Sequence, residues 1–402
     1  MRDVVIVEAC RTAVGKFGGA LKPLNADLLG TEMIKAVLER SKIDPAKIDE
    51  VIFGHCRQTS DFSNTARWCA LKAGIPESVP ANTVMIACAS AMLAVNNGAN
   101  SIMTGQNDIV LAGGVESMTN GFFYVSNARW GVGTGSTQFK DCLTEAQINS
   151  QPVDMYGSYL MGMTAENIAE KYGITREESD RFSCESQNRA EKAIKSGRFK
   201  DEIVPITVPQ GRKKDPIVFD TDEFPHFGTT MEGLAKLPPA FKKPDGIVTA
   251  GSSSGRNDGA AAVLLMSAEK AEELGYKPLV KIRAIAEAGV DPRIMGMGPV
   301  PATAKALRLA GLKLEDMGLI ELNEAFAAQS LGCIKEMGLE DKMDIINVNG
   351  GAVALGHPIG CSGVRILVTL IHEMKKRGTK YGLATLCVAG GMGMATIVEN
   401  CD

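Results

Sequence analysis

The chain has 402 residues, of which 45% are hydrophobic and 22% charged, and its formal net charge is −4. A chain of this length buries a large core and divides into two or three domains, and its composition excludes disordered and fibrous classes. Charges of both signs are scattered along the chain, without the basic stripe that follows a phosphate backbone, so we expect no nucleic acid partner.

The apolar runs are all too short to cross a bilayer, and the N-terminal run in MRDVVIVEACRT is too short for a secretion signal. The C-terminal residues IVENCD carry no address for the peroxisome or the endoplasmic reticulum. The ten cysteines form no CxxC pair and no Cys/His cluster with metal-ligand spacing. We therefore expect free thiols, no metal, no membrane contact and a cytoplasmic location.

Short apolar runs alternate with amphipathic stretches in the first part of the chain. DVVIVEA, EVIFGHC, TVMIACA and DIVLAGG are typical of strands, and LLGTEMIKAVLERS and NTARWCALKAGI are typical of helices. Such alternation predicts βαβ units, an α/β fold and a mainly parallel sheet. Residues 1–118 are therefore predicted to form an N-terminal core domain.

The pattern changes between residues 119 and 246. The glycine-rich NGFFYVSNARWGVGTGSTQ is followed by the charged helical stretch TREESDRFSCESQNRAEKAIKSGRF and the turn-rich PQGRKKDPIVFDTDEFPHFGTT. We interpret 119–246 as an inserted domain. A strand in DGIVTAG and the helix-forming NDGAAAVLLMSAEKAEELG then return the chain to the core, so that 247–270 complete the first domain.

The last third repeats the order of the first. LVKIRAIAEAG, DIINVNGG, YGLATLCVAGG and MGMATIVEN predict strands, PVPATAKALRLAG and GVRILVTLIHEMKKRG predict helices, and GLIELNEAF passes from strand to helix. Residues 271–402 are therefore predicted to form a C-terminal core domain that resembles the first. Ligands of open α/β sheets bind beyond the carboxyl ends of strands, where each half carries a cysteine, Cys88 or Cys387.

Cys88 stands where a predicted strand passes into a predicted helix. Backbone N–H groups and the helix dipole would face its sulfur there, and such a thiol is acidified and becomes a better nucleophile. A structural cysteine buried against the sheet is the alternative, because strand-to-helix cysteines are common without any chemistry.

Three further stretches carry residues suited to chemistry at the same edge. His357 lies in the glycine- and proline-rich NVNGGAVALGHPIGCSG, whose rigid loop can place an imidazole for proton transfer, or can simply be a surface turn. Cys387 precedes Gly390 and Gly391, which either admit a carbonyl to backbone N–H groups or form a tight hairpin. Asn323, at a strand-to-helix junction, is a further candidate, or a helix cap.

Taken in this order, the sequence resembles the thiolase family from end to end. The matching letters are CRTAVGKFGG, CASAM, GGVESM, MGMTAEN, SQNRAEKA, GRFKDEIVP, DGIVTAGSSSGRNDGAAA, NEAFA, NGGAVALGHPIGCSG and CVAGGMG. The resemblance implies duplicated βαβαβαββ units in a layered α-β-α-β-α core with an inserted α+β loop domain. It also implies an acyltransferase that joins two acyl-CoA molecules, such as acetyl-CoA, into a 3-ketoacyl-CoA plus CoA, or reverses this, through an acyl-cysteine.

The same resemblance implies the role of each site residue. Cys88 matches the nucleophile, His357 the histidine that takes its proton, and Cys387 the base that removes an α-proton from the second acyl-CoA. Asn323 matches the residue that holds a water beside this histidine, where the two donors face one oxyanion. The backbone N–H groups of Cys88 and Ala389 match the other oxyanion site. A thiolate suits base work because the ordinary thiol pKa lies near the operating pH.

Contacts with coenzyme A are implied for Arg212, Ser254, Leu160 and Met161, although the GRKKD around Arg212 is also typical of a solvated turn. CoA thioesters are then substrates, and no permanently bound cofactor is expected. Residues 119–138 resemble a tetramerisation loop, which implies a homotetramer.

The sequence departs from the family pattern at four positions. Ala91 and Leu93 replace Gly and Lys, Ala389 replaces Gly, and Leu160 replaces a histidine of short-chain members. Because Leu160 makes the pocket wall more apolar, we hypothesise tolerance for longer or branched acyl groups. Ketoacyl synthases, HMG-CoA synthases and a non-catalytic acyl-CoA-binding homologue are the alternatives. GHPIG followed by CVAGG favours a thiolase, and the intact catalytic set disfavours a binding protein.

Overall fold

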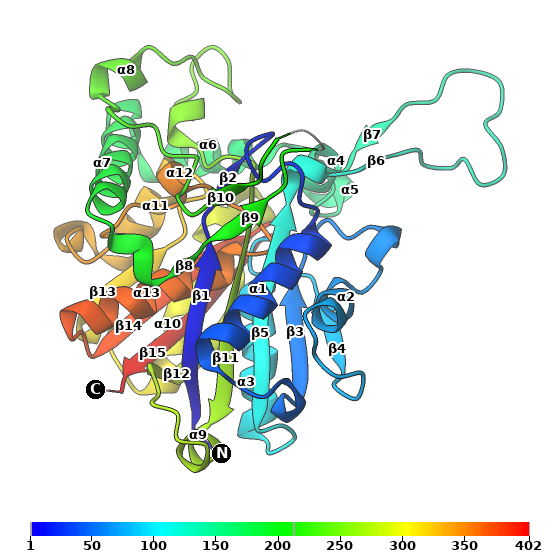
Figure 1. Ribbon diagram of the computed structural model, residues 1–402. Coiled ribbons are helices and arrows are strands. Elements are labelled where there is room, and N and C mark those ends of the chain that lie inside the picture. Colours follow the sequence, from blue (N-terminus) through cyan, green and yellow to red (C-terminus); the bar gives the residue numbers. More distant parts are fainter. Residues whose placement is uncertain (1, 212–213, 402) are drawn as a thin grey trace.

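The computed structural model describes residues 2–211 and 214–401, and within them an 11-stranded sheet runs through the molecule (Figure 1). Its strand order is β13-β14-β15-β12-β1-β11-β5-β3-β4, with β2 (Gly15–Lys16) beside β11 and β8 (Ile203–Val204) beside β1. The two halves of the sheet meet where β1 (Val4–Thr12) pairs antiparallel with β12 (Val280–Gly289).

The first half contains β1 and four further strands, which are β3 (Glu50–Gly54), β4 (Ala81–Val84), β5 (Ile109–Ser117) and β11 (Asn257–Ser267). β3 runs parallel to β4 and β5, whereas β11 runs antiparallel to β5 and β1. The carboxyl ends of β3, β4 and β5 therefore share one edge, which is where the predicted ligand site lies.

The second half repeats this arrangement with β12, β13 (Leu319–Leu322), β14 (Tyr381–Val388) and β15 (Met392–Asn400). β13 is parallel to β14, and β15 is antiparallel to β14 and β12. A parallel bridge between Ile320 and Ile346 stands where β4 stands in the first half. The predicted duplication of one α/β unit is confirmed. The predicted mainly parallel sheet is wrong, because β11 and β15 pair antiparallel with their neighbours on both sides.

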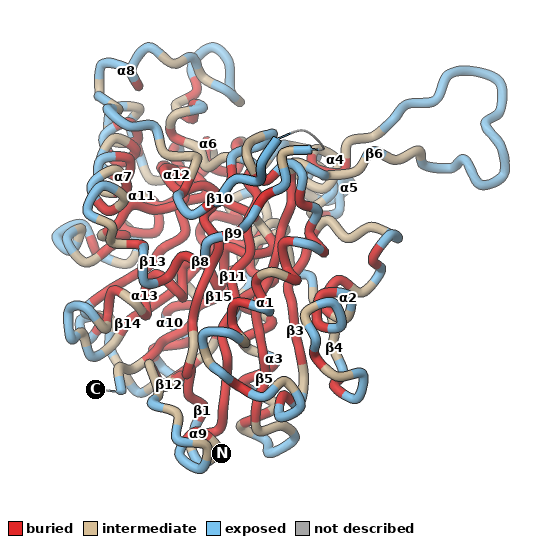
Figure 2. Tube along the Cα trace, in the orientation of Figure 1, coloured by how far each residue is buried: buried red, intermediate tan, exposed pale blue. Residues whose placement is uncertain are grey.

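Helices cover the sheet in layers. Between the two halves lie α3 (Ser90–Met103) and α13 (Ser362–Arg377), whose apolar residues share one buried cluster with strands of both halves. α1 (Ala26–Ser41) and α2 (Thr65–Lys72) cover the outer face of the first half. α10 (Pro299–Ala310) and α11 (Ala327–Met337) cover that of the second. The predicted α-β-α-β-α order is confirmed, and Figure 2 shows the buried strands at its centre.

One predicted helix is wrong. The alanine-rich stretch before α9 (Ala268–Glu273) forms β11, and all 11 residues of this strand are buried. Alanine favours a helix by itself, but small side chains also fit a strand that is covered on both faces and hydrogen-bonded on both edges. Tertiary packing between β1 and β5 therefore overrides the local propensity.

Two predicted strands are also wrong. In DGIVTAG, the backbone N–H groups of Ile247 and Val248 donate to the Glu166 carboxylate at 3.0 and 2.9 Å, so a side chain takes the place of a neighbouring strand. In DIINVNGG only the bridge at Ile346 forms, because the next residue, Asn347, adopts a left-handed backbone with φ of 44°.

The inserted segment lies against the strand ends at the top of Figure 1. Its elements are β6 (Phe123–Tyr124), β7 (Lys140–Asp141), α4 (Cys142–Ile148), α5 (Val153–Tyr156), α6 (Met161–Tyr172), α7 (Arg176–Lys195), β8, β9 (Ile206–Val208), β10 (Ile217–Phe219) and α8 (Met231–Ala235). The β6–β7 hairpin projects far from the body. The domain boundaries stay a prediction. None of the helices in the described part of the chain is long and apolar enough to cross a membrane.

Candidate active site

Cys88 lies in the turn between β4 and α3, and side chains hold this turn rigid. The residue before it, Ala87, has a φ of 48°, which a non-glycine residue adopts only where its surroundings impose it. The Ser90 hydroxyl accepts from the Ile86 N–H at 2.9 Å and donates to the Ala87 carbonyl at 2.7 Å. The Cys56 thiol donates to the same carbonyl at 3.0 Å. These bonds hold the backbone of the turn that carries Cys88.

The Cys88 thiol is half-buried, and burial raises its pKa above the ordinary value. The backbone N–H of Ala389, the charge of Arg57 and the N–H of Cys88 itself act in the opposite direction without overcoming it. The predicted net acidification of this thiol is therefore wrong for the structure, since loss of hydration outweighs the N–H donors. Because the Ala389 and Cys88 N–H groups lower the pKa of this thiol, both lie near its sulfur, and their role as oxyanion donors stays a prediction.

His357 follows the short helix α12 (Ala352–Leu355) and is 6% exposed. Its backbone N–H donates to Asn257 Oδ1 at 2.9 Å. Preceding Gly356 has a φ of 96°, and a Cβ there would lie 2.5 Å from the Asn257 side chain, so only glycine fits. The loop therefore lies against β11 in the interior, which excludes the alternative of a surface turn.

The hydrogen bonds of His357 decide which ring nitrogen carries its proton. Nδ1 lies 2.6 Å from the Ser362 hydroxyl, and that hydroxyl donates its one hydrogen to the Pro358 carbonyl at 2.9 Å. Ser362 must then accept from Nδ1–H, which leaves Nε2 with a free lone pair. Nε2 is buried and has no partner among the described residues. Burial and the positive charge of Arg365 lower the pKa of His357 to about 4, so the ring is a neutral acceptor at pH 7.

Asn323 follows β13 and is fully buried. Its backbone N–H donates to the Thr385 carbonyl at 3.0 Å, but neither Oδ1 nor Nδ2 of its side chain has a partner among the described residues. An unpaired buried amide costs about 1–3 kcal/mol per group, which points to a group that holds water or a ligand. The alternative of a helix cap is excluded, because α11 begins at Ala327 with Phe326 before it.

Cys387 lies near the end of β14, opposite Gly393 of β15, and is fully buried. Burial, followed by the charge of Cys88, raises its pKa well above the ordinary value. The predicted pKa near the operating pH is therefore wrong, because an apolar site disfavours the thiolate. The next residues also form the tight hairpin named as the alternative, with φ of 92° and 87° at Gly390 and Gly391. This hairpin presents the Ala389 N–H to Cys88.

Both halves of the chain match family models, over residues 4–269 for "Thiolase, N-terminal domain" and residues 276–400 for "Thiolase, C-terminal domain". The chain belongs to the thiolase family. The acetyl-CoA acetyltransferase of Chromobacterium violaceum is 53% identical over 398 residues, with 99% of this chain and 100% of that protein covered. That of Cupriavidus necator is 51% identical over 400 residues, with full coverage of both.

Solved structures agree with the fold of this thiolase. The acetyl-CoA acetyltransferase of Bacillus anthracis superimposes with a TM-score of 0.95 at 46% identity, covering 100% of this chain and 99% of that one. Human mitochondrial 3-ketoacyl-CoA thiolase in complex with CoA gives 0.93 at 41% identity, with 100% and 98% covered. These relatives bear out the predicted family, fold and thiolase activity, which is that of an acyltransferase.

A buried carboxylate, Glu116 at the end of β5, connects the loops that carry the candidate residues Cys88 and His357. It accepts from the backbone N–H groups of Cys56, Arg57 and Gly360 at 3.1, 3.2 and 3.0 Å. Burial opposes its charge, but His55, Arg57 and these donors together lower its pKa below the ordinary value. Cys56 supports the Cys88 turn and Gly360 belongs to the His357 loop, so Glu116 fixes one loop relative to the other.

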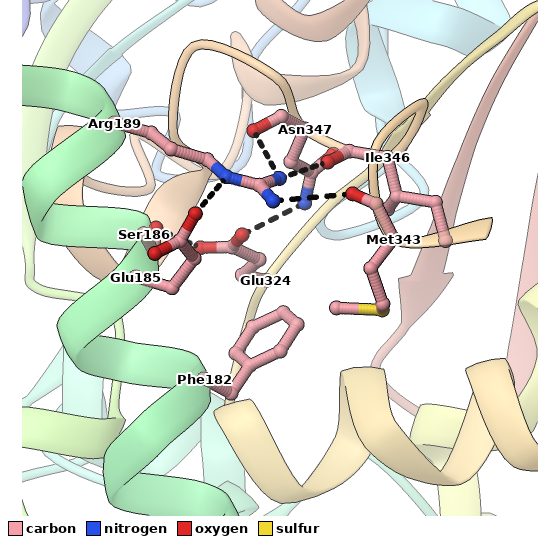
Figure 3. A pocket seen from close by; sticks show the side chains of 8 residues that line it. All are labelled: Phe182, Glu185, Ser186, Arg189, Glu324, Met343, Ile346 and Asn347. Atoms are coloured by element: carbon pink, nitrogen blue, oxygen red, sulfur yellow. Dashed lines mark hydrogen bonds and ion pairs between the residues drawn. The ribbon is translucent and has the colours of Figure 1, made fainter. Parts of the chain in front are cut away.

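A second buried carboxylate, Glu324, follows directly after Asn323 in the chain. Figure 3 shows it together with Ser186 and Asn347. Glu324 accepts from Ser186 at 2.7 Å, from Asn347 at 2.8 Å and from the Val353 N–H at 3.1 Å. The pocket beside it has a volume of about 10 Å³, which is room for one water at most. This network between α7 and the strand ends anchors the backbone at Asn323, and it offers no space for substrate.

The structure describes three of the four residues that are predicted to contact CoA. Leu160 is 37% exposed and directly precedes α6, and Met161 begins that helix, with its N–H 3.3 Å from Gln147 Oε1. The Ser254 N–H donates to the Ala325 carbonyl at 3.0 Å, two residues from Asn323. Arg212 lies outside the described residues. The CoA contacts stay predictions.

Sequence reasoning missed the residues that support the site. Asn257 holds the His357 loop and Ser362 sets its tautomer, whereas Glu116 joins the loops. All three residues lie inside motifs shared with the thiolase family. Glu116 is the one charged residue in the apolar strand sequence IVLAGGVES, which could have marked it as a buried group with a role. Arg57 had no such signal, because only the folded chain brings it near Cys88. Among the described residues, no cluster of His, Cys, Asp and Glu could hold a metal ion.

Proposed function

We propose that this thiolase condenses two molecules of acetyl-CoA to acetoacetyl-CoA and CoA, and catalyses the reverse thiolysis, through an acyl group on Cys88. The observation that carries the proposal is the donor pair at one sulfur. The N–H groups of Cys88 and Ala389 both face the Cys88 thiol, where they would stabilise the oxyanion of an acyl-enzyme. The relatives that match over their full length are named acetyl-CoA acetyltransferases, which favours acetyl as the acyl group that is transferred.

In thiolysis, Cys88 Sγ bonds to C3 of the 3-ketoacyl-CoA while its proton passes to His357 Nε2, the free acceptor. The C2–C3 bond then breaks, and C2 takes the proton of the Cys387 thiol, so that acetyl-CoA leaves. Protonated His357 passes its proton to the Cys387 thiolate. CoA then gives its thiol proton to neutral His357 and takes the acyl group, and His357 returns this proton to the Cys88 thiolate. Condensation is the reverse. Asn323, with its unpaired amide, orients a water toward the thioester oxygen beside His357.

The direct test is to trap the acyl-enzyme. The protein is incubated with acetyl-CoA, quenched in acid and digested, and the added acetyl group is located by peptide mass spectrometry. Acetylation of Cys88 is expected in the wild type and in Cys387→Ala, but not in Cys88→Ala. Cys184→Ser, which changes a half-buried thiol on α7, is the matched control and should retain the label. Absence of label on Cys88 with acetyl-, propionyl- and longer acyl-CoAs would refute the proposal.

Leu160 is proposed to widen the choice of acyl group, because its apolar side chain stands where short-chain members carry a histidine. We expect kcat/KM for 3-ketohexanoyl-CoA and 2-methylacetoacetyl-CoA to lie within about tenfold of that for acetoacetyl-CoA, since one methylene changes pocket binding by about 1–3 kcal/mol. Leu160→His is expected to shift the ratio toward acetoacetyl-CoA. Steady-state thiolysis rates check this, and a strong wild-type preference for acetoacetyl-CoA would reject it.

A homotetramer in the cytoplasm is proposed as the working state. The β6–β7 hairpin projects from the body in Figure 1. It exposes four large apolar side chains, those of Phe123, Trp130, Val132 and Phe139, and such a concentration on one segment favours a protein interaction surface. No disulfide joins cysteines within the part of the chain that the structure describes, which suits a reducing compartment.

If the β6–β7 hairpin holds the tetramer together, a substitution in it should change the oligomeric state. Trp130→Ser is expected to convert the tetramer to dimers, because it removes the most exposed large apolar side chain of the loop. Analytical ultracentrifugation measures the change. Met155→Ser removes another exposed apolar side chain, 69% exposed and outside the hairpin, and should leave the mass unchanged. A wild type that sediments as a dimer would contradict the tetramer.

A further inference from the structure

A pocket of about 420 Å³ opens beside Cys56 and Arg57, in the loop that follows β3. Its volume lies within the range of about 300–1,000 Å³ that is common for small-molecule sites. The wall contains Phe122 and Tyr124, with their ring centroids 6.1 Å apart, and also Cys56, Arg57 and Glu145. The two rings offer an apolar surface to methylene groups, and the arginine adds one cation.

The pocket adjoins the turn that carries Cys88. Cys56, in its wall, donates to the Ala87 carbonyl at 3.0 Å and lies 3.3 Å from the Ser90 hydroxyl. The charge of Arg57 also lowers the pKa of both Cys88 and Cys142, which places the guanidinium near these two thiols. An acyl chain on Cys88 therefore has this pocket within its surroundings.

The Arg57 guanidinium has no anionic partner within residues 2–211 and 214–401. Its one hydrogen bond to the described residues runs from Nη1 to the Cys56 carbonyl at 3.3 Å, and its Nε is buried without a partner. A guanidinium carries five N–H donors in a fork that matches a carboxylate, so most of its binding capacity is unused.

The two acidic groups nearby are already engaged. Glu145, in the same wall, lies 3.2 Å from the Lys140 ammonium. Glu116 is fully buried, accepts three backbone N–H groups and lies 3.4 Å from His55 Nε2. Among the described residues neither lies within ion-pair distance of the guanidinium, although the charge of Arg57 does lower the pKa of Glu116. The pocket thus presents an apolar wall that ends at a cation free to bind an anion.

We propose that Arg57 binds a carboxylate at the far end of the acyl chain on Cys88, so that the substrates include 3-ketoacyl-CoA thioesters whose chain ends in a carboxylate. This inference rests on the proposed function. In the step concerned, Cys88 Sγ bonds to C3 and the C2–C3 bond breaks. Acetyl-CoA leaves with the proton of Cys387, and the carboxylate-ended half stays on Cys88 with its anion at Arg57. CoA then removes it.

The test compares two six-carbon substrates that differ at one end, 3-ketoadipyl-CoA with a carboxylate and 3-ketohexanoyl-CoA with a methyl group. Arg57→Gln keeps the backbone N–H to Glu116 and removes the charge. Because the charge of Arg57 also lowers the pKa of Cys88, some loss is expected on both substrates, but kcat/KM for thiolysis of 3-ketoadipyl-CoA should fall by about tenfold to a hundredfold more than that for 3-ketohexanoyl-CoA. Arg57→Lys should restore part of the loss.

Arg181→Gln is the matched control, because this arginine is exposed on α7 and paired with Glu177. It should change neither rate. Equal loss on both substrates in Arg57→Gln would overturn the inference, as would a wild type that cleaves 3-ketohexanoyl-CoA and ignores 3-ketoadipyl-CoA. Either result leaves the thiolase reaction standing, provided that Cys88 is labelled in the trapping experiment. Failure of all turnover together with absence of that label would overturn both proposals.

Discussion

His357→Asn is expected to lower kcat/KM for thiolysis of acetoacetyl-CoA by about a hundredfold to ten-thousandfold, the usual contribution of a positioned acid or base. The reason is the free lone pair on Nε2, which is held in a neutral ring and buried without a competing partner. Steady-state cleavage rates measure the loss, and a thermal melt of the same preparation separates it from unfolding. Activity within threefold of wild type in a folded variant would remove His357 from the reaction.

Ser362→Ala is expected to lower the activity less than His357→Asn does. It removes the acceptor for Nδ1–H at 2.6 Å and lets the ring adopt the other tautomer, so we expect a loss in kcat of about tenfold with little change in KM. Ser362→Thr, which retains a hydroxyl, should restore part of the rate. Ser183→Ala is matched in burial, since its hydroxyl donates to the Ser179 carbonyl within α7, and it should retain full activity.

The pKa of His357 also predicts the acid limb of the rate profile. With a pKa of about 4 the ring stays neutral far below the ordinary histidine value, so kcat/KM should not fall through His357 protonation until the pH approaches 4. Stability behaves differently. Between pH 6.5 and pH 4, His357 is protonated in the unfolded chain but neutral in the folded chain. The contribution of His357 to the free energy of unfolding therefore decreases as the pH falls toward 4.

Strands and helices were predictable wherever hydrophobic periodicity and local propensity agreed. α1 has a buried face that matches its helical periodicity, whereas β1 and β5 are largely apolar runs that lie buried on both faces. α7 begins at a capping box of Thr175 and Glu178. β11 was not predictable in this way, because alanine is a strong helix former and only its covered neighbours β1 and β5 hold it extended. Where local propensity and tertiary environment favour different structures, packing and hydrogen bonding with the neighbouring strands determine which structure forms.

The identity of the candidate site residues could be read from the sequence, but their protonation could not. Cys88, Cys387 and His357 stand in recognisable motifs, whereas the pKa of each depends on how completely the fold removes water from it. The charge of Arg365, which helps to keep His357 neutral, comes from a helix packed in the middle layer. Such electrostatic effects arise only when the layers have assembled.

Cys387→Ala is expected to separate the two halves of the reaction. Acyl transfer between acetyl-CoA and Cys88 uses only Cys88, His357 and the oxyanion donors, so exchange of isotopically labelled CoA into acetyl-CoA should stay near the wild-type rate. Cleavage and formation of the carbon–carbon bond need a proton at C2, and both should fall by about a hundredfold to ten-thousandfold. Cys333→Ala, which changes a buried thiol of the same apolar cluster, is the control and should preserve both activities.

The raised pKa of Cys387 adds a pH dependence to this prediction, because it means that the Cys387 thiol is protonated before substrate binds. A buried thiol whose pKa lies well above its ordinary value holds its proton at neutral pH, and is ready to act as an acid in thiolysis. In condensation it must lose that proton first. Wild-type condensation should therefore rise more steeply than thiolysis between pH 7 and pH 9, and both slopes should vanish in the residual activity of Cys387→Ala. Parallel pH profiles for the two directions would show that another group carries the proton of C2.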